Sequence, residues 1–258
     1  MTTPSPAGAP GRQPEPGREG NALDYLVVGH VTKDITPDAP GGYVFGGTAS
    51  FASLTIRNLG RRAGVLTRCA PLPELSAFLS GVALHCVPAL ETTTFENIYT
   101  GQERVQYVRA VAPPISADSV PAAWRSTPVL HLGPLVQEVP AEIADAFPAS
   151  TLVGATPQGW TRAWDGDGRV RQVPWTNAEQ ALERIDVLIF SVEDMRGDAD
   201  LIRRYAEMAR LAVVTEGRRG CTVWREGRRE RFPAFDVEEV DPTGAGDVFA
   251  AAFFLRYA

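Results

Sequence analysis

The sequence has little of several features that mark common classes of protein. Lys33 is the only lysine among 258 residues, and no G-x-x-x-x-G-K-[ST] segment surrounds it, which excludes a P-loop nucleotide site. The three cysteines have no metal-ligand spacing. Such an odd and sparse set is typical of a reducing compartment rather than of a disulfide framework. We therefore expect a cytoplasmic protein.

Long apolar runs and an excess of basic charge are absent as well. No stretch approaches the ~18 apolar residues of a membrane span, and the N-terminus lacks the layout of a secretion signal. A net charge of −6 argues against a nucleic-acid groove. Residues 1–20, rich in proline and glycine, are expected to form a disordered leader. Residues 21–258 remain for one globular domain with neither a membrane nor a nucleic-acid partner.

Short apolar segments of strand length alternate along the chain with segments of helical period. This alternation predicts an α/β fold with a mostly parallel central sheet. Strands are expected at residues 23–29, 63–67, 82–87, 129–132, 151–154, 186–190 and 211–215. Helices are expected at 48–59, 72–80, 140–147, 177–185, 199–210 and 248–258, and β-hairpins at 91–111, 162–173 and 221–235.

The segment Asp241–Asp247, D-P-T-G-A-G-D, precedes the last apolar helix. Its small residues leave backbone N–H groups open to a ligand at a helix N-terminus, which predicts an anion site. An acid beside such amides suits a general base that takes a proton from a hydroxyl group while the amides stabilise phosphoryl charge. The alternative is that Asp247 only caps the helix, a contribution of roughly 0.3 to 1 kcal/mol.

This segment resembles the D-T-x-G-A-G-D signature of the ribokinase-like (PfkB) carbohydrate kinases, with Pro242 where many members have threonine. The resemblance implies a three-layer α/β/α fold with a small β lid. It makes Asp247 the catalytic base and the amides of Gly244, Ala245 and Gly246 the anion hole for the γ-phosphate. It also implies an ATP site that includes Asp241 and Thr243, and Mg²⁺ as the metal ion.

Two further segments match that family on the nucleotide side. Thr215, Gly217 and Gly220 fit its T-x-G-x-x-G pattern beside the nucleotide. Ser191 and Asp194 occupy the positions of its N-x-x-E pattern, which implies a phosphate contact for Ser191 and a magnesium contact for Asp194. These two residues also fit a capping pair for the helix at 199–210, and both interpretations stay open.

Candidate substrate residues lie on three loops and on the predicted lid. Each of these residues also has an explanation without a ligand. Asp34 fits a local turn, the polar lid residues fit an exposed hairpin that must stay soluble, and Gln158 fits an ordinary loop. Lid strands are expected at 43–45 and 91–111. Phe51 stands where the family's G-G-x-x-x-N segment has asparagine, which puts ribose-like recognition in doubt. The candidates are Asp34, Gly46, Gly47, Asn97, Arg104 and Gln158.

The resemblance therefore implies a kinase that phosphorylates a hydroxyl group of a small sugar or cyclitol. The segments 46–51, 91–96 and 241–243 resemble the myo-inositol kinase branch more than ribokinase itself. Because the family usually continues through further helices after this motif, we expect the chain to be truncated at its C-terminal end, and family members often pair through the lid. The alternative class is a non-catalytic ligand-binding or regulatory protein on the same fold.

Overall fold

The computed structural model describes residues 22–100 and 103–258. The expected disordered leader at 1–20 lies outside the described residues. Within them, a nine-stranded sheet forms the centre of the molecule, with the strand order β15-β14-β13-β12-β9-β8-β1-β4-β5. The strands from β13 to β5 are parallel, while β14 and β15 run antiparallel at one edge. This arrangement confirms the predicted mostly parallel sheet.

The sheet strands fall close to the predicted apolar segments. Residues 211–215 form a strand with the expected bounds, and the hairpin expected at 221–235 is present as β14 and β15. The strands of this sheet are β1 (Tyr25–Val28), β4 (Ala63–Cys69), β5 (Ala83–Pro88), β8 (Val129–Leu132), β9 (Leu152–Ala155), β12 (Val187–Ser191), β13 (Leu211–Thr215), β14 (Cys221–Arg225) and β15 (Arg228–Phe232).

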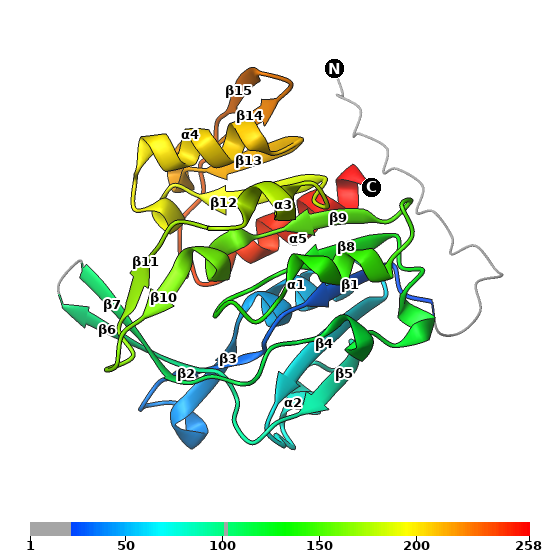
Figure 1. The fold of residues 1–258 in the computed structure, drawn as a ribbon. Coiled ribbons are helices and arrows are strands. Elements are labelled where there is room, and N and C mark those ends of the chain that lie inside the picture. The colour runs from blue at the N-terminus through cyan, green and yellow to red at the C-terminus, as the bar shows by residue number, and fades with distance from the viewer. Residues whose placement is uncertain (1–21, 101–102) are drawn as a thin grey trace, which may run out of the picture.

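Helices cover both faces of the sheet and give a three-layer α/β/α fold (Figure 1). Helices α1 (Thr48–Asn58) and α5 (Ala245–Tyr257) pack on one face, where Val27 and Ile189 are buried. Helices α3 (Ala178–Leu182) and α4 (Ala199–Met208) pack on the other face, against Leu26 and Leu188. Because successive strand residues point to opposite faces, strands covered on both sides must be apolar throughout. This is why the sequence shows them as continuous apolar runs.

Several predicted helices are shorter or tighter than expected. The segment 72–80 contains only α2 (Leu75–Phe78), and 140–147 forms a 3₁₀ helix in place of an α-helix. Pro140 and Pro148 flank the second segment and restrict it to a few residues. The 3₁₀ segments are η1 (Pro40–Gly42), η2 (Ala117–Ser119), η3 (Ala122–Trp124), η4 (Ala141–Ala146), η5 (Pro157–Thr161), η6 (Glu193–Met195) and η7 (Gly217–Arg219).

A separate four-stranded sheet with the order β3-β2-β6-β7 forms the lid. Its strands are β2 (Thr32–Ile35), β3 (Tyr43–Gly46), β6 (Thr94–Thr100) and β7 (Glu103–Ala110). The hairpin β6–β7 and the strand β3 were predicted, but β2 was not, and it lies between β3 and β6. Asp34 therefore lies in a lid strand rather than in a loop. The short, mostly polar segment 32–35 gives no strand signal, since only its pairing on both edges makes it a strand.

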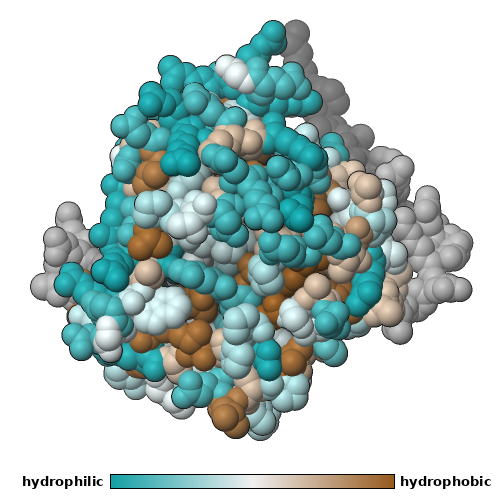
Figure 2. Space-filling model, in the orientation of Figure 1, coloured by the Kyte–Doolittle hydropathy of each residue, from teal (hydrophilic) through white to brown (hydrophobic). Residues whose placement is uncertain are grey.

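A small two-stranded sheet lies beside the lid (Figure 1). Its strands are β10 (Arg162–Trp164) and β11 (Val170–Gln172), and a backbone bridge between Tyr107 and Arg169 joins it to the lid. The face of the molecule in Figure 2 is largely hydrophilic over α4, with hydrophobic patches nearer the lid end. No helix within the described ranges is long and apolar enough to cross a membrane.

Candidate active site

The N-termini of two helices meet at the centre of the candidate site. Thr48 is the first residue of α1, and Asp247 lies in the first turn of α5. The Thr48 hydroxyl group donates a hydrogen bond of 2.7 Å to Asp247 Oδ1. This bond joins residues 199 positions apart in the sequence and fixes the orientation of the Asp247 carboxyl group.

Asp247 is half-buried, and its environment makes it a stronger base than an ordinary aspartate. Removal of the carboxyl group from water raises its pKa to about 6. The hydrogen bond from Thr48 opposes this rise, the charge of Asp194 adds to it, and the charge of Arg162 opposes it. A group with this pKa is mostly ionised at neutral pH and still accepts a proton readily, which suits a general base.

The start of α5 presents backbone amides beside this carboxyl group. The first helical hydrogen bond runs from the Val248 amide to the Gly244 carbonyl group, and the Ala245 amide donates to the Pro242 carbonyl group. The amides of Gly246 and Asp247, in the first helical turn, have no carbonyl group of their own helix to bond. They give this helix end the donors and the positive dipole that favour an anion.

Phe51 supports the turn before α5. Gly244 has a φ of 74°, and a Cβ atom there would lie 2.6 Å from the Phe51 ring. Both the backbone conformation and the close approach require glycine at this position. Phe51 is therefore a packing residue beneath the turn, which gives a structural reason for its departure from the asparagine of the family pattern.

A cleft of about 900 Å³ opens over this helix end. Nine of the residues predicted from the sequence line it, namely Gly244, Ala245, Gly246, Asp247, Thr215, Gly217, Ser191, Asp194 and Gln158. Sequence reasoning missed several other polar lining residues, namely Thr48, Gln106, Thr156, Arg162, Arg169, Gln172 and Arg196. Charged groups of both signs line this cleft, and the charges of Asp194 and Arg162 act on the Asp247 carboxyl group.

Ser191 and Asp194 close a small capping box at the end of β12. Asp194 Oδ2 accepts from the Ser191 amide at 2.8 Å, and Ser191 Oγ accepts from the Asp194 amide at 3.0 Å. Asp194 Oδ1 accepts from Gln158 Nε2 at 2.7 Å, so two predicted residues with different roles come together. These two bonds hold the turn between β12 and η6, and they do not cap α4, whose N-cap is Asp198.

The described part of the chain holds no group of three or more side chains that together suit a metal ion. A single carboxylate such as Asp194 fits a magnesium ion that takes most of its ligands from phosphate groups and water. The residues present are thus compatible with magnesium only when a phosphate ligand is bound.

Four predicted substrate residues lie outside the lining of the cleft, on the lid strands or at the start of α1: Asp34, Gly46, Gly47 and Asn97. The Asp34 carboxyl group lies against Gly46, where a Cβ atom would overlap it, and it accepts from the Thr32 hydroxyl group at 3.2 Å. Gly47 is the N-cap of α1. Asn97 Oδ1 accepts from Gln106 Nε2 at 3.0 Å, so Asn97 contacts a residue of the cleft. Arg104 lies on β7, and its side chain is outside the described part.

The remaining predicted nucleotide residues hold the backbone around the cleft. Asp241 Oδ1 accepts from the Thr243 amide at 2.9 Å, and its bonds with Thr243 lower the pKa of this exposed carboxyl group. Gly220, with a φ of 96°, follows η7 and lies against the backbone at Phe232 of β15. Neither Asp241 nor Gly220 lines the cleft.

Some of the cleft residues that sequence reasoning missed had a signal in the sequence, and others had none. Thr48 had a signal, because a hydroxyl side chain at the start of a helix after two glycines lies where helix-terminus ligands bind. Arg162, Arg169 and Arg196 had none, since arginine is common on any surface.

Comparison with known proteins agrees with this geometry. Residues 179–258 match the family model described as the pfkB family carbohydrate kinase. A cytidine kinase from Thermococcus kodakarensis is 26% identical over 252 residues, covering 92% of this chain and 89% of that kinase. An inositol 3-kinase from Zea mays is 27% identical over 259 residues, covering 91% of this chain and 66% of that kinase.

Solved structures share the fold. A pyrophosphate-dependent kinase of the ribokinase family, complexed with a pyrophosphate analogue and myo-inositol, superposes with a TM-score of 0.75 at 22% identity over 90% of this chain and 86% of that one. Arabidopsis thaliana ribokinase, complexed with ribose and ATP, gives a TM-score of 0.65 at 16% identity over 92% and 86%. The match of residues 179–258 to the family model, the kinase relatives and the ribokinase-like fold together make this chain similar to the PfkB carbohydrate kinases.

Proposed function

We propose that this protein transfers the γ-phosphoryl group of ATP to a hydroxyl group of a small sugar or cyclitol, with Asp247 as the general base. The observation that carries the proposal is the position of the Asp247 carboxyl group. It has a pKa of about 6 and lies beside the first-turn amides of α5 in an open cleft. Phosphoryl transfer to an alcohol needs a base that takes the hydroxyl proton and, close to it, hydrogen-bond donors that stabilise the charge of the phosphoryl group.

In this proposal Thr48 and the first-turn amides of α5 assist Asp247 in the transfer step. The Thr48 hydroxyl group holds the Asp247 carboxyl group so that its other oxygen takes the proton of the acceptor. The cradle of Gly244, Ala245 and Gly246 stabilises the negative charge on the transferred group, chiefly through the Gly246 amide.

Residues around the cradle would hold the donor and the acceptor. Thr215, Gly217 and Ser191 line the donor side of the cleft, with Gly220, Asp241 and Thr243 supporting the loops. Gln158, Asp34, Gly46, Gly47, Asn97 and Arg104 are the proposed acceptor contacts. A magnesium ion bound near Asp194 would neutralise part of the negative charge of the phosphate groups.

A cyclitol such as myo-inositol is the proposed acceptor. Support comes from the inositol 3-kinase relative and from the myo-inositol complex of a kinase with the same fold. The cytidine kinase relative makes a nucleoside the main alternative.

Pyrophosphate is a second candidate donor. The fold neighbour with a TM-score of 0.75 is named as pyrophosphate-dependent. In addition, the cleft is lined by Arg169 and Arg196, and no carboxylate of the described residues pairs with either one in a salt bridge. Unpaired guanidinium groups suit a small, highly charged phosphate donor.

A donor and acceptor panel tests the proposal. Product formation is measured by mass spectrometry with ATP or pyrophosphate as donor and with myo-inositol, ribose, fructose, cytidine or adenosine as acceptor, in the presence of magnesium. We expect phosphorylated myo-inositol to form fastest. Titration calorimetry with ATP accompanies the panel, because binding without turnover of any acceptor supports the non-catalytic alternative.

The variant D247N tests the role of the base. Because general-base assistance contributes ~10²- to 10⁴-fold, turnover should fall by that factor with little change in donor affinity. The control is D236N, which removes an exposed carboxyl group that does not line the cleft. Turnover of D247N within a few-fold of the parent protein would rule out Asp247 as the base.

A further inference from the structure

Two cysteines meet on neighbouring strands at one edge of the central sheet. Cys69 ends β4, and Cys86 lies on β5, the edge strand that runs parallel to it. The register pairs Thr67 with Cys86 and Cys69 with Pro88, which sets the two side chains diagonally across the strand pair. Their Sγ atoms are 2.6 Å apart.

Both cysteines are free thiols, and at this separation they lie within reach of a disulfide bond, which joins its sulfurs at about 2.05 Å. The strand register, rather than a flexible loop, holds both cysteines in place, so only a small side-chain movement separates the thiols from a bond.

The two thiols differ in access and in acidity. Cys69 is buried, whereas Cys86 is half-buried on the outermost strand. The contact with Cys69 lowers the pKa of Cys86, and the same contact together with burial raises the pKa of Cys69. The more accessible sulfur is therefore the one that ionises first, as a reactive thiol requires.

We propose that Cys69 and Cys86 form a reversible dithiol–disulfide pair that responds to low-molecular-weight disulfides. The Cys86 thiolate attacks one sulfur of the small disulfide, forms a mixed disulfide with it and releases the first small thiolate. The Cys69 thiol then loses its proton and attacks the Cys86 sulfur, which forms the Cys69–Cys86 bond and releases the second small thiolate. Two protein thiols are oxidised and one small disulfide is reduced to two thiols.

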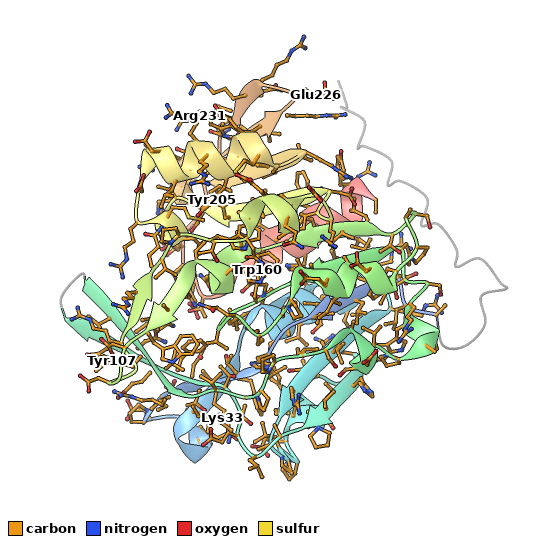
Figure 3. The ribbon with its side chains drawn as sticks, in the orientation of Figure 1. Lys33, Tyr107, Trp160, Tyr205, Glu226 and Arg231 are labelled. Carbon is orange, nitrogen blue, oxygen red and sulfur yellow. The ribbon has the colours of Figure 1, made fainter. Side chains whose placement is uncertain are left out.

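The position of the pair connects it to the lid. Ala70 follows Cys69 and donates its amide to the Thr92 hydroxyl group at 3.2 Å, two residues before lid strand β6. Nearby, Phe78 of α2 packs on Phe45 of β3, with ring centroids 4.9 Å apart. The disulfide would thus fix the part of the sheet edge on which the lid rests. The lid strand β2, which carries Lys33, lies in the same region (Figure 3).

Thiol counting across a redox series tests this inference without any enzyme assay. The full chain is equilibrated in buffers of graded reduced and oxidised glutathione, quenched with acid, alkylated with a maleimide and analysed by intact mass and peptide mapping. Cys221 on β14, near the other edge of the sheet, supplies the control variant C221S. The variant C69S keeps the Cys86 thiol that attacks glutathione disulfide but lacks the second thiol, so the reaction should stop at the mixed disulfide.

We expect the parent protein to change from three alkylated cysteines to one, with Cys69 linked to Cys86, and to recover all three after dithiothreitol. C221S should lose its two alkylated cysteines over the same range of glutathione ratios, and C69S should accumulate a glutathione adduct on Cys86. Three alkylated cysteines in the parent protein at every ratio would overturn the proposal. A linkage that includes Cys221, or a glutathione adduct on Cys86 that persists in the parent protein, would overturn it as well. The comparison of the parent protein with C221S decides the question even where C69S fails to fold.

Discussion

Replacement of Asp247 by asparagine should make the protein more stable at alkaline pH while it lowers turnover. The folded structure raises the pKa of Asp247 to about 6 from the ordinary value of 3.8. The folded state therefore binds this proton more tightly than the unfolded state does. By linkage, the contribution of Asp247 to stability is largest below about pH 4 and is lost as the pH rises through about 6.

The size of the effect follows from the same two values. Each pKa unit corresponds to about 1.4 kcal/mol, which gives an upper limit of about 3 kcal/mol for the cost of ionising Asp247 in the folded protein. Because the side chain is partly exposed, we expect D247N to raise the free energy of unfolding by about 1 to 3 kcal/mol near pH 8. The asparagine carbonyl oxygen can still accept the hydrogen bond from Thr48, so little of this gain is lost.

Urea denaturation followed by tryptophan fluorescence, near pH 4 and near pH 8, measures this difference. The gain should be present at the higher pH and nearly absent at the lower one. D236N, which changes an exposed carboxyl group, should stay within about 0.5 kcal/mol of the parent protein at both pH values. An equal gain at both pH values, or a loss of stability near pH 8, would show that burial does not raise the pKa of Asp247.

Two further variants test the neighbours of Asp247. T48V removes the hydrogen bond that lowers the pKa of Asp247, so the acidic limb of kcat/KM should move to higher pH by about one unit, while T48S keeps it in place. An unchanged pH profile in T48V would mean that this bond does not act on the base. G244A forces a Cβ atom to within 2.6 Å of the Phe51 ring at a φ of 74°, so denaturation should show a loss of about 1 to 3 kcal/mol. G246A is the matched control, because a Cβ atom at Gly246 meets no atom within 4 Å.

Much of the sheet was predictable because its strands are covered on both faces. Burial on both sides requires continuous apolar residues, and such runs are visible in a single sequence. The strand at 211–215 and the hairpin of β14 and β15 were predicted for this reason. By contrast, β2 has a short and polar sequence, and its strand conformation depends on pairing with β3 and β6. No local pattern carries that information.

The candidate site divides in the same way. The small residues of 241–247 and the acid at its end place open backbone amides beside a carboxyl group through local backbone chemistry, so the sequence alone predicted this arrangement. The pKa of Asp247 depends on its burial and on Thr48, Asp194 and Arg162, three residues from separate parts of the chain. The contact of Cys69 with Cys86 likewise exists only because β4 and β5 are neighbours in one register. Properties that depend on adjacent residues can be predicted from the sequence. Desolvation, electrostatic fields and contacts across strands arise only when the folded chain brings distant residues together.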